Sequence, residues 1–192
     1  KKVECKEKSE KPPALYDLTS LQRDANRILG FTAQQTLDYT QSLYEKKLVT
    51  YPRTDSRYLT DDMAGMVSGL VKGVAAVYGI MNPVPIQASQ IINSSRVSDH
   101  HAIIPTRTMP QTDPAELPSG EQAILWLVCT GLLVSVGEAH RYAETVAAFD
   151  CAGHEFTAKG KVVLEPGWKD IQRRILKTNG KEKGIQPLPD IK

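Results

Sequence analysis

The periodicity of the apolar residues changes near His140, and this change limits the chain to folds that combine helices with a separate sheet. Before His140, apolar residues recur at helical spacing in four stretches. After it, residues 145–151, 155–159 and 161–164 favour strands, separated by Gly153 and Gly160. Residues 3–8 form a further strand-like run at the start. The sequence therefore predicts an α+β protein.

Two helices and a strand are predicted in quick succession. Ser20 is expected to cap the first helix, which Gly30 ends. Thr32 opens a Thr-x-x-Gln capping box for the second helix, which runs to about Lys47. Residues 48–51 then favour a strand. Helix, turn, helix and strand follow one another in the order of a winged helix-turn-helix.

Two more helices and a long loop complete the first part of the chain. Thr60, followed by two aspartates, is expected to cap the third helix. Ser119 is expected to cap the fourth, which continues to about Val136. Between them, residues 82–112 are rich in proline and polar residues, which predicts an extended loop. At the other end of the chain, residues 177–184 are predicted to be a mobile connector.

The composition narrows the class of protein without naming a partner. Among 192 residues, 24 Lys and Arg stand against 22 Asp and Glu, so any nucleic-acid surface must be local. The three cysteines lack CxxC spacing, which favours reduced thiols in a cytoplasmic protein. No apolar stretch is long enough for a bilayer, so we expect a soluble chain with no membrane partner. A charged start without an initiator Met suggests a piece of a longer parent.

Chemically active side chains are concentrated directly after the predicted helix-turn-helix. The segment reads Thr50-Tyr51-Pro52-Arg53-Thr54-Asp55-Ser56-Arg57-Tyr58-Leu59. A tyrosine phenolate can attack a phosphodiester and keep the phosphoryl group as an ester, which allows resealing without ATP. Because a free phenol has a pKa of about 10, such a site must favour the phenolate and stabilise charge on the phosphate.

Arg53 is the candidate for that stabilisation. Two positions along an extended chain place Tyr51 and Arg53 on the same side, and the guanidinium group can bind a phosphate through two hydrogen bonds. Asp55 falls on that side again and could orient Arg53 or a histidine. A tyrosine at a strand end is more often a packed ring, so the spacing alone leaves both interpretations open.

Four stretches resemble motifs of the type IA DNA topoisomerases, and the form Thr50-Tyr51-Pro52-Arg53-Thr54-Asp55 resembles the topoisomerase III branch in particular. Residues 51–56 resemble the active-site tyrosine motif. Residues 12–26 are similar to the start of the family's catalytic domain. Residues 99–106, Asp-His-His-Ala-Ile-Ile-Pro-Thr, resemble its histidine motif, and residues 160–168 resemble a strand and turn of its gate region.

The resemblance implies a role for each candidate residue. Tyr51 attacks single-stranded DNA to form a 5′-phosphotyrosine, and another strand passes through the break before resealing. Arg53 holds the scissile phosphate, and His100 contacts that phosphate or the Asp55 network. The supporting, DNA-binding candidates are Thr50, Thr54 and Asp55.

The resemblance also implies how the chain is organised and what it lacks. A winged-helix-like catalytic domain, residues 12–140, is inserted into a β-rich gate or hinge region formed by residues 1–11 and 141–192. The family's Toprim domain binds Mg²⁺ with an acidic cluster. Since this chain has no Asp-x-Asp-x-Asp run, no metal site is expected in it. The expected partners are single-stranded DNA and the remaining domains of a monomeric parent, and the fragment alone is not expected to relax DNA.

Two other classes of protein remain as alternatives. A non-catalytic winged-helix DNA-binding module would insert the second helix into the major groove. That helix carries Asp38, Glu45, Lys46 and Lys47, a mixture of charges that a basic reading face lacks. A tyrosine recombinase would place several Arg and His residues around the nucleophile, and Tyr51 followed closely by Arg53, with His-His-Ala-Ile-Ile-Pro downstream, fits that arrangement poorly.

Overall fold

The computed structural model describes residues 2–80 and 86–176, which divide into two compact units. We call Pro13–Gly137 the helical unit, and the described parts of Lys1–Pro12 and Glu138–Lys192 the sheet unit. Helices and an antiparallel sheet are both present, in agreement with the predicted α+β class. The predicted connector and residues 82–85 of the predicted loop lie outside the described residues.

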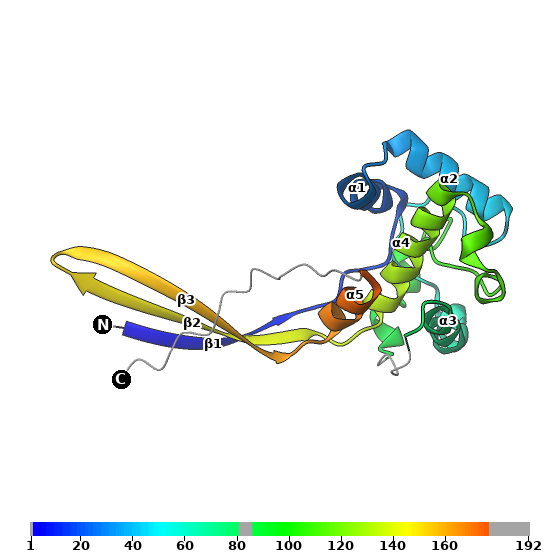
Figure 1. Cartoon of the computed structure of the whole chain (residues 1–192). Coiled ribbons are helices and arrows are strands. Elements are labelled where there is room, and N and C mark those ends of the chain that lie inside the picture. Colours follow the sequence, from blue (N-terminus) through cyan, green and yellow to red (C-terminus); the bar gives the residue numbers. More distant parts are fainter. Residues whose placement is uncertain (1, 81–85, 177–192) are drawn as a thin grey trace. The chain divides into compact units, whose positions relative to one another are not determined.

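The helical unit is organised around one buried helix. Its helices are α1 (Leu18–Leu29), α2 (Ala33–Glu45), α3 (Ala64–Val77) and α4 (Ser119–Ser135). The apolar α4 packs against the other three helices and lies between α2 and α3 (Figure 1). Gly120 permits close packing with α2, because a Cβ at that position would lie 2.4 Å from the Tyr39 ring. A single core therefore supports all four helices.

The first two helices begin at local capping motifs. Asp17 caps α1 by accepting a hydrogen bond from the backbone N–H of Ser20 at 2.6 Å. The prediction that Ser20 is the cap is wrong, because Ser20 is the third helical residue and completes the capping box. The Thr32 capping box of α2 and the left-handed Gly30 that ends α1 are confirmed. α2 ends at Glu45, before Lys47, which has a φ of 61°.

The other two predicted caps are wrong. Thr60 precedes a 3₁₀ turn, Asp61–Met63, and its side chain makes no capping hydrogen bond. The backbone N–H of Asp61 instead donates to Ser94 Oγ at 2.9 Å, from a distant part of the chain. Ser119 is the first residue of α4 rather than its cap, because Pro118 occupies the N-cap position, where no side-chain capping hydrogen bond is made.

The segments between the helices are mostly irregular. The predicted strand at residues 48–51 is wrong, because only an isolated bridge joins Val49 to Pro105. A proline partner has no N–H to donate, which limits the ladder at this point. Short 3₁₀ turns at Ala88–Gln90, Ser94–Arg96, Met109–Gln111 and Pro114–Glu116 interrupt the long connection between α3 and α4. The winged-helix description therefore stays a prediction.

The sheet unit contains three antiparallel strands in the order β1-β2-β3. They are β1 (Lys2–Glu10), β2 (His140–Cys151) and β3 (His154–Glu165), and they form a long ribbon (Figure 1). The start of β2 at His140 confirms the predicted change from helix to strand. Gly160 was expected to separate two strands, but it pairs with Thr145 inside β3. The residues before and after Gly160 also pair with β2, so β3 continues through the glycine without a break.

One helix of the sheet unit was not predicted. This helix, α5 (Trp168–Leu176), follows β3. The Trp168 indole donates to the carbonyl oxygen of Glu10 at 3.1 Å, and Lys169 forms an ion pair with the Glu10 carboxylate at 2.5 Å. Trp168, Ile171 and Ile175 recur at helical spacing, so a local signal was present in the sequence.

Two features from the sequence can be checked directly. All three cysteines are free thiols, with Cys129 buried and Cys5 and Cys151 exposed. Among residues 2–80 and 86–176, no helix combines the length and the apolar character needed to cross a bilayer.

Candidate active site

Two segments of the helical unit run side by side and bring the predicted site residues together. We call residues 50–59 the tyrosine segment and residues 98–106 the histidine segment. The Thr50 backbone N–H donates to the Ile104 carbonyl oxygen at 2.9 Å. The Thr50 hydroxyl accepts from the Ile104 N–H at 3.0 Å and donates to the Ala102 carbonyl oxygen at 3.0 Å. Thr50 therefore links the two segments immediately before Tyr51.

Thr54 makes a second link on the other side of Tyr51. Its hydroxyl donates to the His100 carbonyl oxygen at 2.8 Å and accepts from the Ser56 N–H at 3.1 Å. Its carbonyl oxygen accepts from the Leu18 N–H at 3.1 Å, which ties the segment to the start of α1. The side chain is buried, so Thr54 fixes the backbone beside His100 rather than offering its hydroxyl to a ligand.

The side chains of the tyrosine segment alternate between the core and the surface. Pro52, Thr54 and Ser56 are buried, whereas Arg53 and Asp55 are exposed. Tyr51 is half-buried on the same alternation. An extended backbone directs successive side chains to opposite sides, so the alternation places the phenol, the guanidinium group and the carboxylate on one side.

Two aromatic side chains contact the Tyr51 ring. The His100 imidazole lies with its centroid 4.4 Å from the Tyr51 ring centroid, at an interplanar angle of 45°. Tyr44, from the last turn of α2, makes an edge-on contact at 5.4 Å and 77°. His100 comes from the histidine segment and is exposed. The structure thus brings together Tyr51 and His100, which lie far apart in the sequence.

Arg53 and Asp55 are left available on the exposed side. Asp55 Oδ1 accepts a hydrogen bond from the Ser98 hydroxyl at 3.4 Å. Within the described ranges, the exposed Arg53 has no hydrogen bond or ion pair with Asp55, so Asp55 does not orient it in this structure. His101, the residue after His100, has its Nδ1 2.9 Å from the Ala102 carbonyl oxygen and makes no ring contact with Tyr51. A phosphate approaching this side would meet the exposed guanidinium group of Arg53.

Arg57 anchors the far end of the tyrosine segment, a role that the sequence did not reveal. Its Nε donates to the Leu15 carbonyl oxygen at 2.9 Å, and its Nη2 to that of Ala14 at 3.3 Å. Ser56 Oγ donates to the Arg96 carbonyl oxygen at 2.9 Å. Any residue can supply a backbone carbonyl oxygen, so the sequence contains no signal for these hydrogen bonds. The sequence alone therefore could not show that Arg57 has a structural role and Arg53 does not.

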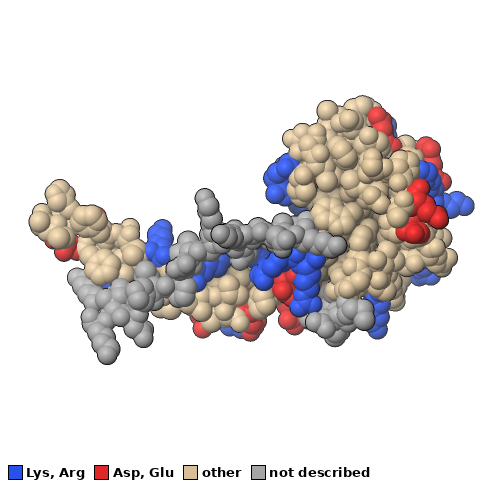
Figure 2. Space-filling view, in the orientation of Figure 1, with Lys and Arg blue, Asp and Glu red and all other residues tan. Residues whose placement is uncertain are grey.

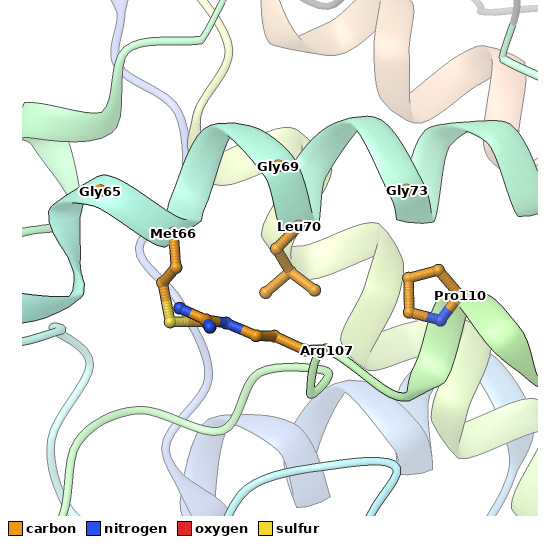
Figure 3. A pocket seen from close by; sticks show the side chains of 7 residues that line it. All are labelled: Gly65, Met66, Gly69, Leu70, Gly73, Arg107 and Pro110. Carbon is orange, nitrogen blue, oxygen red and sulfur yellow. The ribbon is translucent and has the colours of Figure 1, made fainter.

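One pocket of the helical unit lies along α3 and does not involve the predicted site residues. It is lined mainly by glycine and apolar side chains, with the Arg107 side chain lying along it (Figure 3). In the part of the chain that the structure describes, no group of three or more His, Cys, Asp and Glu side chains is placed to hold a metal ion. On the face shown in Figure 2, positive and negative side chains are scattered over the helical unit.

Comparisons with known proteins assign the chain to a family. The family model described as DNA topoisomerase matches residues 1–192. DNA topoisomerase 3 of Bacillus subtilis (strain 168) is 41% identical over 174 residues, which are 83% of this chain and 23% of the relative. The protein of that name from Bacillus licheniformis is 38% identical over 186 residues, 93% of this chain and 25% of the relative. The chain thus spans about a quarter of the length of these relatives.

A solved structure shares the fold. Full-length topoisomerase I from Thermotoga maritima matches with a TM-score of 0.74 and 21% sequence identity, over 100% of this chain and 31% of that one. The family match covers the tyrosine and histidine segments as well as the sheet unit. The resemblance seen in the sequence motifs is therefore confirmed, and the chain belongs to the DNA topoisomerase family as a type IA member similar to the proteins named DNA topoisomerase 3.

Proposed function

We propose that this chain is the tyrosine-bearing part of an enzyme that cleaves and rejoins single-stranded DNA through a covalent bond to Tyr51. The observation that carries the proposal is the placement of Tyr51 and Arg53 on one side of a segment whose alternate residues are buried, with His100 against the Tyr51 ring. In a member of the DNA topoisomerase family, this arrangement provides a nucleophile, a cation for the phosphate and a titratable ring.

The proposed reaction conserves the energy of the phosphodiester bond. The Tyr51 oxygen attacks the phosphorus after losing its proton, the bond from phosphorus to the 3′ oxygen breaks, and that oxygen leaves as a 3′-hydroxyl after gaining a proton. The product is a 5′-phosphotyrosine. Attack by the 3′-hydroxyl reverses each step and reseals the strand. Arg53 neutralises charge on the phosphate, and His100 contacts the phosphate or the Asp55 network.

Thr50, Thr54 and Asp55 have supporting roles in this proposal. The two threonines fix the tyrosine segment to the histidine segment through hydrogen bonds to backbone atoms. Asp55 reaches Ser98 and lies on the exposed side with Arg53, where it can orient a neighbour once DNA is bound. Their contribution is to hold the reacting groups in position, which accounts for a large part of many enzymatic rate enhancements.

The remaining parts of the proposed enzyme lie outside this chain. The described residues offer no acidic cluster that would suit Mg²⁺, so we assign the metal to a Toprim domain elsewhere in a monomeric, cytoplasmic parent. The helical unit would carry the nucleophile, and the sheet unit would belong to the gate through which a second strand passes. On this basis the isolated chain is expected to be inactive.

The covalent intermediate gives the direct test. The full-length parent, as wild type and as Tyr51→Phe, is incubated with Mg²⁺ and single-stranded oligonucleotides labelled at either the 5′ or the 3′ end, and the reaction is quenched with denaturant. In the wild type, the 3′ label is expected to stay on the protein, while the 5′ label leaves on a fragment ending in a 3′-hydroxyl. Tyr51→Phe is expected to form no adduct, because the nucleophilic oxygen is absent.

A matched control is available in the same segment. Tyr58→Phe removes a phenol oxygen but keeps the ring that lies 5.4 Å from the Arg96 guanidinium carbon. This variant is expected to form the adduct normally. An adduct that persists in Tyr51→Phe would overturn the proposal, and a well-folded wild-type protein that binds DNA without any adduct would favour the binding-module alternative.

A further inference from the structure

We propose that Tyr44 is a positioning residue that holds the ring of the Tyr51 nucleophile, an inference that rests on the function proposed above. Tyr44 lies in the last turn of α2. The structure places its ring edge-on to the Tyr51 ring, at a centroid distance of 5.4 Å. Edge-to-face geometry is a favoured arrangement of two aromatic rings, so the contact restricts how the Tyr51 ring can turn.

The backbone at the end of α2 brings these two tyrosines together. The Tyr44 carbonyl oxygen accepts a hydrogen bond from the Lys47 N–H at 2.8 Å, and the Leu48 N–H donates to the Leu43 carbonyl oxygen at 2.9 Å. Lys47 adopts a φ of 61°, which reverses the chain direction in the left-handed region. The chain then returns along the histidine segment, so that Tyr51 lies beside the last turn of the helix it has just left.

Tyr44 is not needed to fill the core. The buried residues of α2 are Thr36, Thr40 and Leu43, and Tyr44 is not among them. Tyr44 is 39% exposed, an unusual position for a large aromatic side chain that only fills space. Its ring contact with Tyr51 gives a specific reason for an aromatic residue at this site.

The contact with Tyr44 matters because a nucleophile must be held in one orientation to react quickly. Thr50 and Pro52 fix the backbone on either side, but neither limits rotation of the side chain about its first torsion angle. No described residue donates or accepts a hydrogen bond at the Tyr51 hydroxyl. Among the described residues, the aromatic rings that contact Tyr51 are those of Tyr44 and His100. Attack on phosphorus requires an oxygen held about 3–3.5 Å from it, so a freely turning ring would react slowly.

The test separates the Tyr44 ring from its hydroxyl and from the stability of the helix. In the full-length parent, Tyr44→Leu and Tyr44→Gln remove the ring, and Tyr44→Phe keeps it. Single-turnover cleavage of a labelled single-stranded oligonucleotide gives the rate constant, and a titration gives the Kd for the same DNA. Both ring-deleted variants are expected to cleave about tenfold more slowly with a Kd within about twofold of wild type, while Tyr44→Phe stays within about twofold in both.

Tyr39→Leu is the matched control on the same helix. In the wild type, the Tyr39 ring contacts the Phe31 ring, with centroids 5.3 Å apart, and packs against Gly120 rather than against Tyr51. This variant is expected to lower the melting temperature without slowing cleavage at a temperature where it is folded. Gln at position 44 suits the partly exposed site, so a folded ring-deleted variant remains for study if Tyr44→Leu is unstable.

The outcomes distinguish this inference from the proposed function. Normal cleavage by Tyr44→Gln, or an equal loss in Tyr44→Phe and Tyr44→Leu, would overturn the positioning role while Tyr51 remains the nucleophile. A rate loss that follows a matching loss of DNA affinity would also overturn it, by making Tyr44 a DNA contact. If the adduct instead forms in Tyr51→Phe, the proposed function itself fails.

Discussion

The single hydroxyl of Thr50 makes hydrogen bonds to two backbone groups, so its removal should lower the stability of the protein. Thr50→Val keeps the side-chain shape but leaves the Ile104 N–H and the Ala102 carbonyl oxygen without that partner. Because both residues are buried, we expect the free energy of unfolding to fall by about 1–3 kcal/mol. Urea denaturation followed by circular dichroism measures the change. Thr157→Val, at an exposed position of β3, is the control and should change stability by less than about 0.5 kcal/mol. An equal effect of the two substitutions would contradict this role for Thr50.

The same residues show how far the sequence could predict the site. Alternation along an extended chain was enough to place Tyr51, Arg53 and Asp55 on one side, and the observed burial agrees with it. The contacts of Tyr44 and Thr54 were not predictable, because their partners depend on where a helix ends and where a distant loop returns. The chemical roles of the site residues stay predictions that the proposed experiments test.

At the scale of elements, the turn between β2 and β3 offers a prediction with two opposite outcomes. Ala152 and Gly153 have φ angles of 52° and 80°, so both residues of this two-residue turn lie where glycine and asparagine are favoured. Ala152→Asn is expected to raise the free energy of unfolding by up to about 1 kcal/mol, and Gly153→Ala to lower it by about 1 kcal/mol. A Cβ at Gly153 would meet nothing within 4 Å, so only backbone strain is tested. Thermal denaturation measures both, and a shift of the same sign in both variants would contradict the turn assignment.

Elements were predicted well where their signals are local. The Thr32 capping box and the left-handed Gly30 lie within a few residues of the helix ends that they define. Asp61, in contrast, finds its hydrogen-bond acceptor in Ser94, 33 residues away, and no local pattern could indicate that. Gly160 is the opposite case, because here a local signal was present but was outweighed. The low preference of glycine for strands predicted a break, yet pairing with β2 keeps Gly160 inside β3.

At the scale of the whole molecule, the change in periodicity near His140 was the most informative feature of the sequence. It correctly separated a helical part from a sheet, although not the register of that sheet. Glu10 pairs with His140, and Lys2 with Ala148, across the entire helical unit in sequence. Such a register is set by tertiary structure rather than by the alternation of either strand, because β1 is largely exposed and most residues of β2 are partly buried, so neither strand alternates clearly between a buried and an exposed face.

The buried ionisable groups of the helical unit predict a loss of stability at alkaline pH. Burial raises the pKa of the Tyr16 phenol, whose hydroxyl also donates to Asp24 at 2.9 Å, and burial raises the pKa of Tyr78 and of the Cys129 thiol. Each group keeps its proton in the folded state at a pH where the unfolded chain loses it. Their contribution is therefore fully present below the ordinary pKa values of 9.0 for a thiol and 10.0 for a phenol, and is lost as the pH rises above them.

Urea denaturation of the chain between pH 8 and pH 11, roughly the range in which thiols and phenols titrate, tests this sign. Each group is expected to lower the free energy of unfolding by up to about 1.4 kcal/mol for every pH unit above its ordinary pKa. Tyr16→Phe removes one group, so its curve should fall less steeply above pH 10.0 than that of the wild type, even though the variant starts from a lower stability without the Asp24 hydrogen bond. Parallel curves for the two proteins would show that the Tyr16 phenol titrates alike in the folded and unfolded states, and that its burial does not protect the proton.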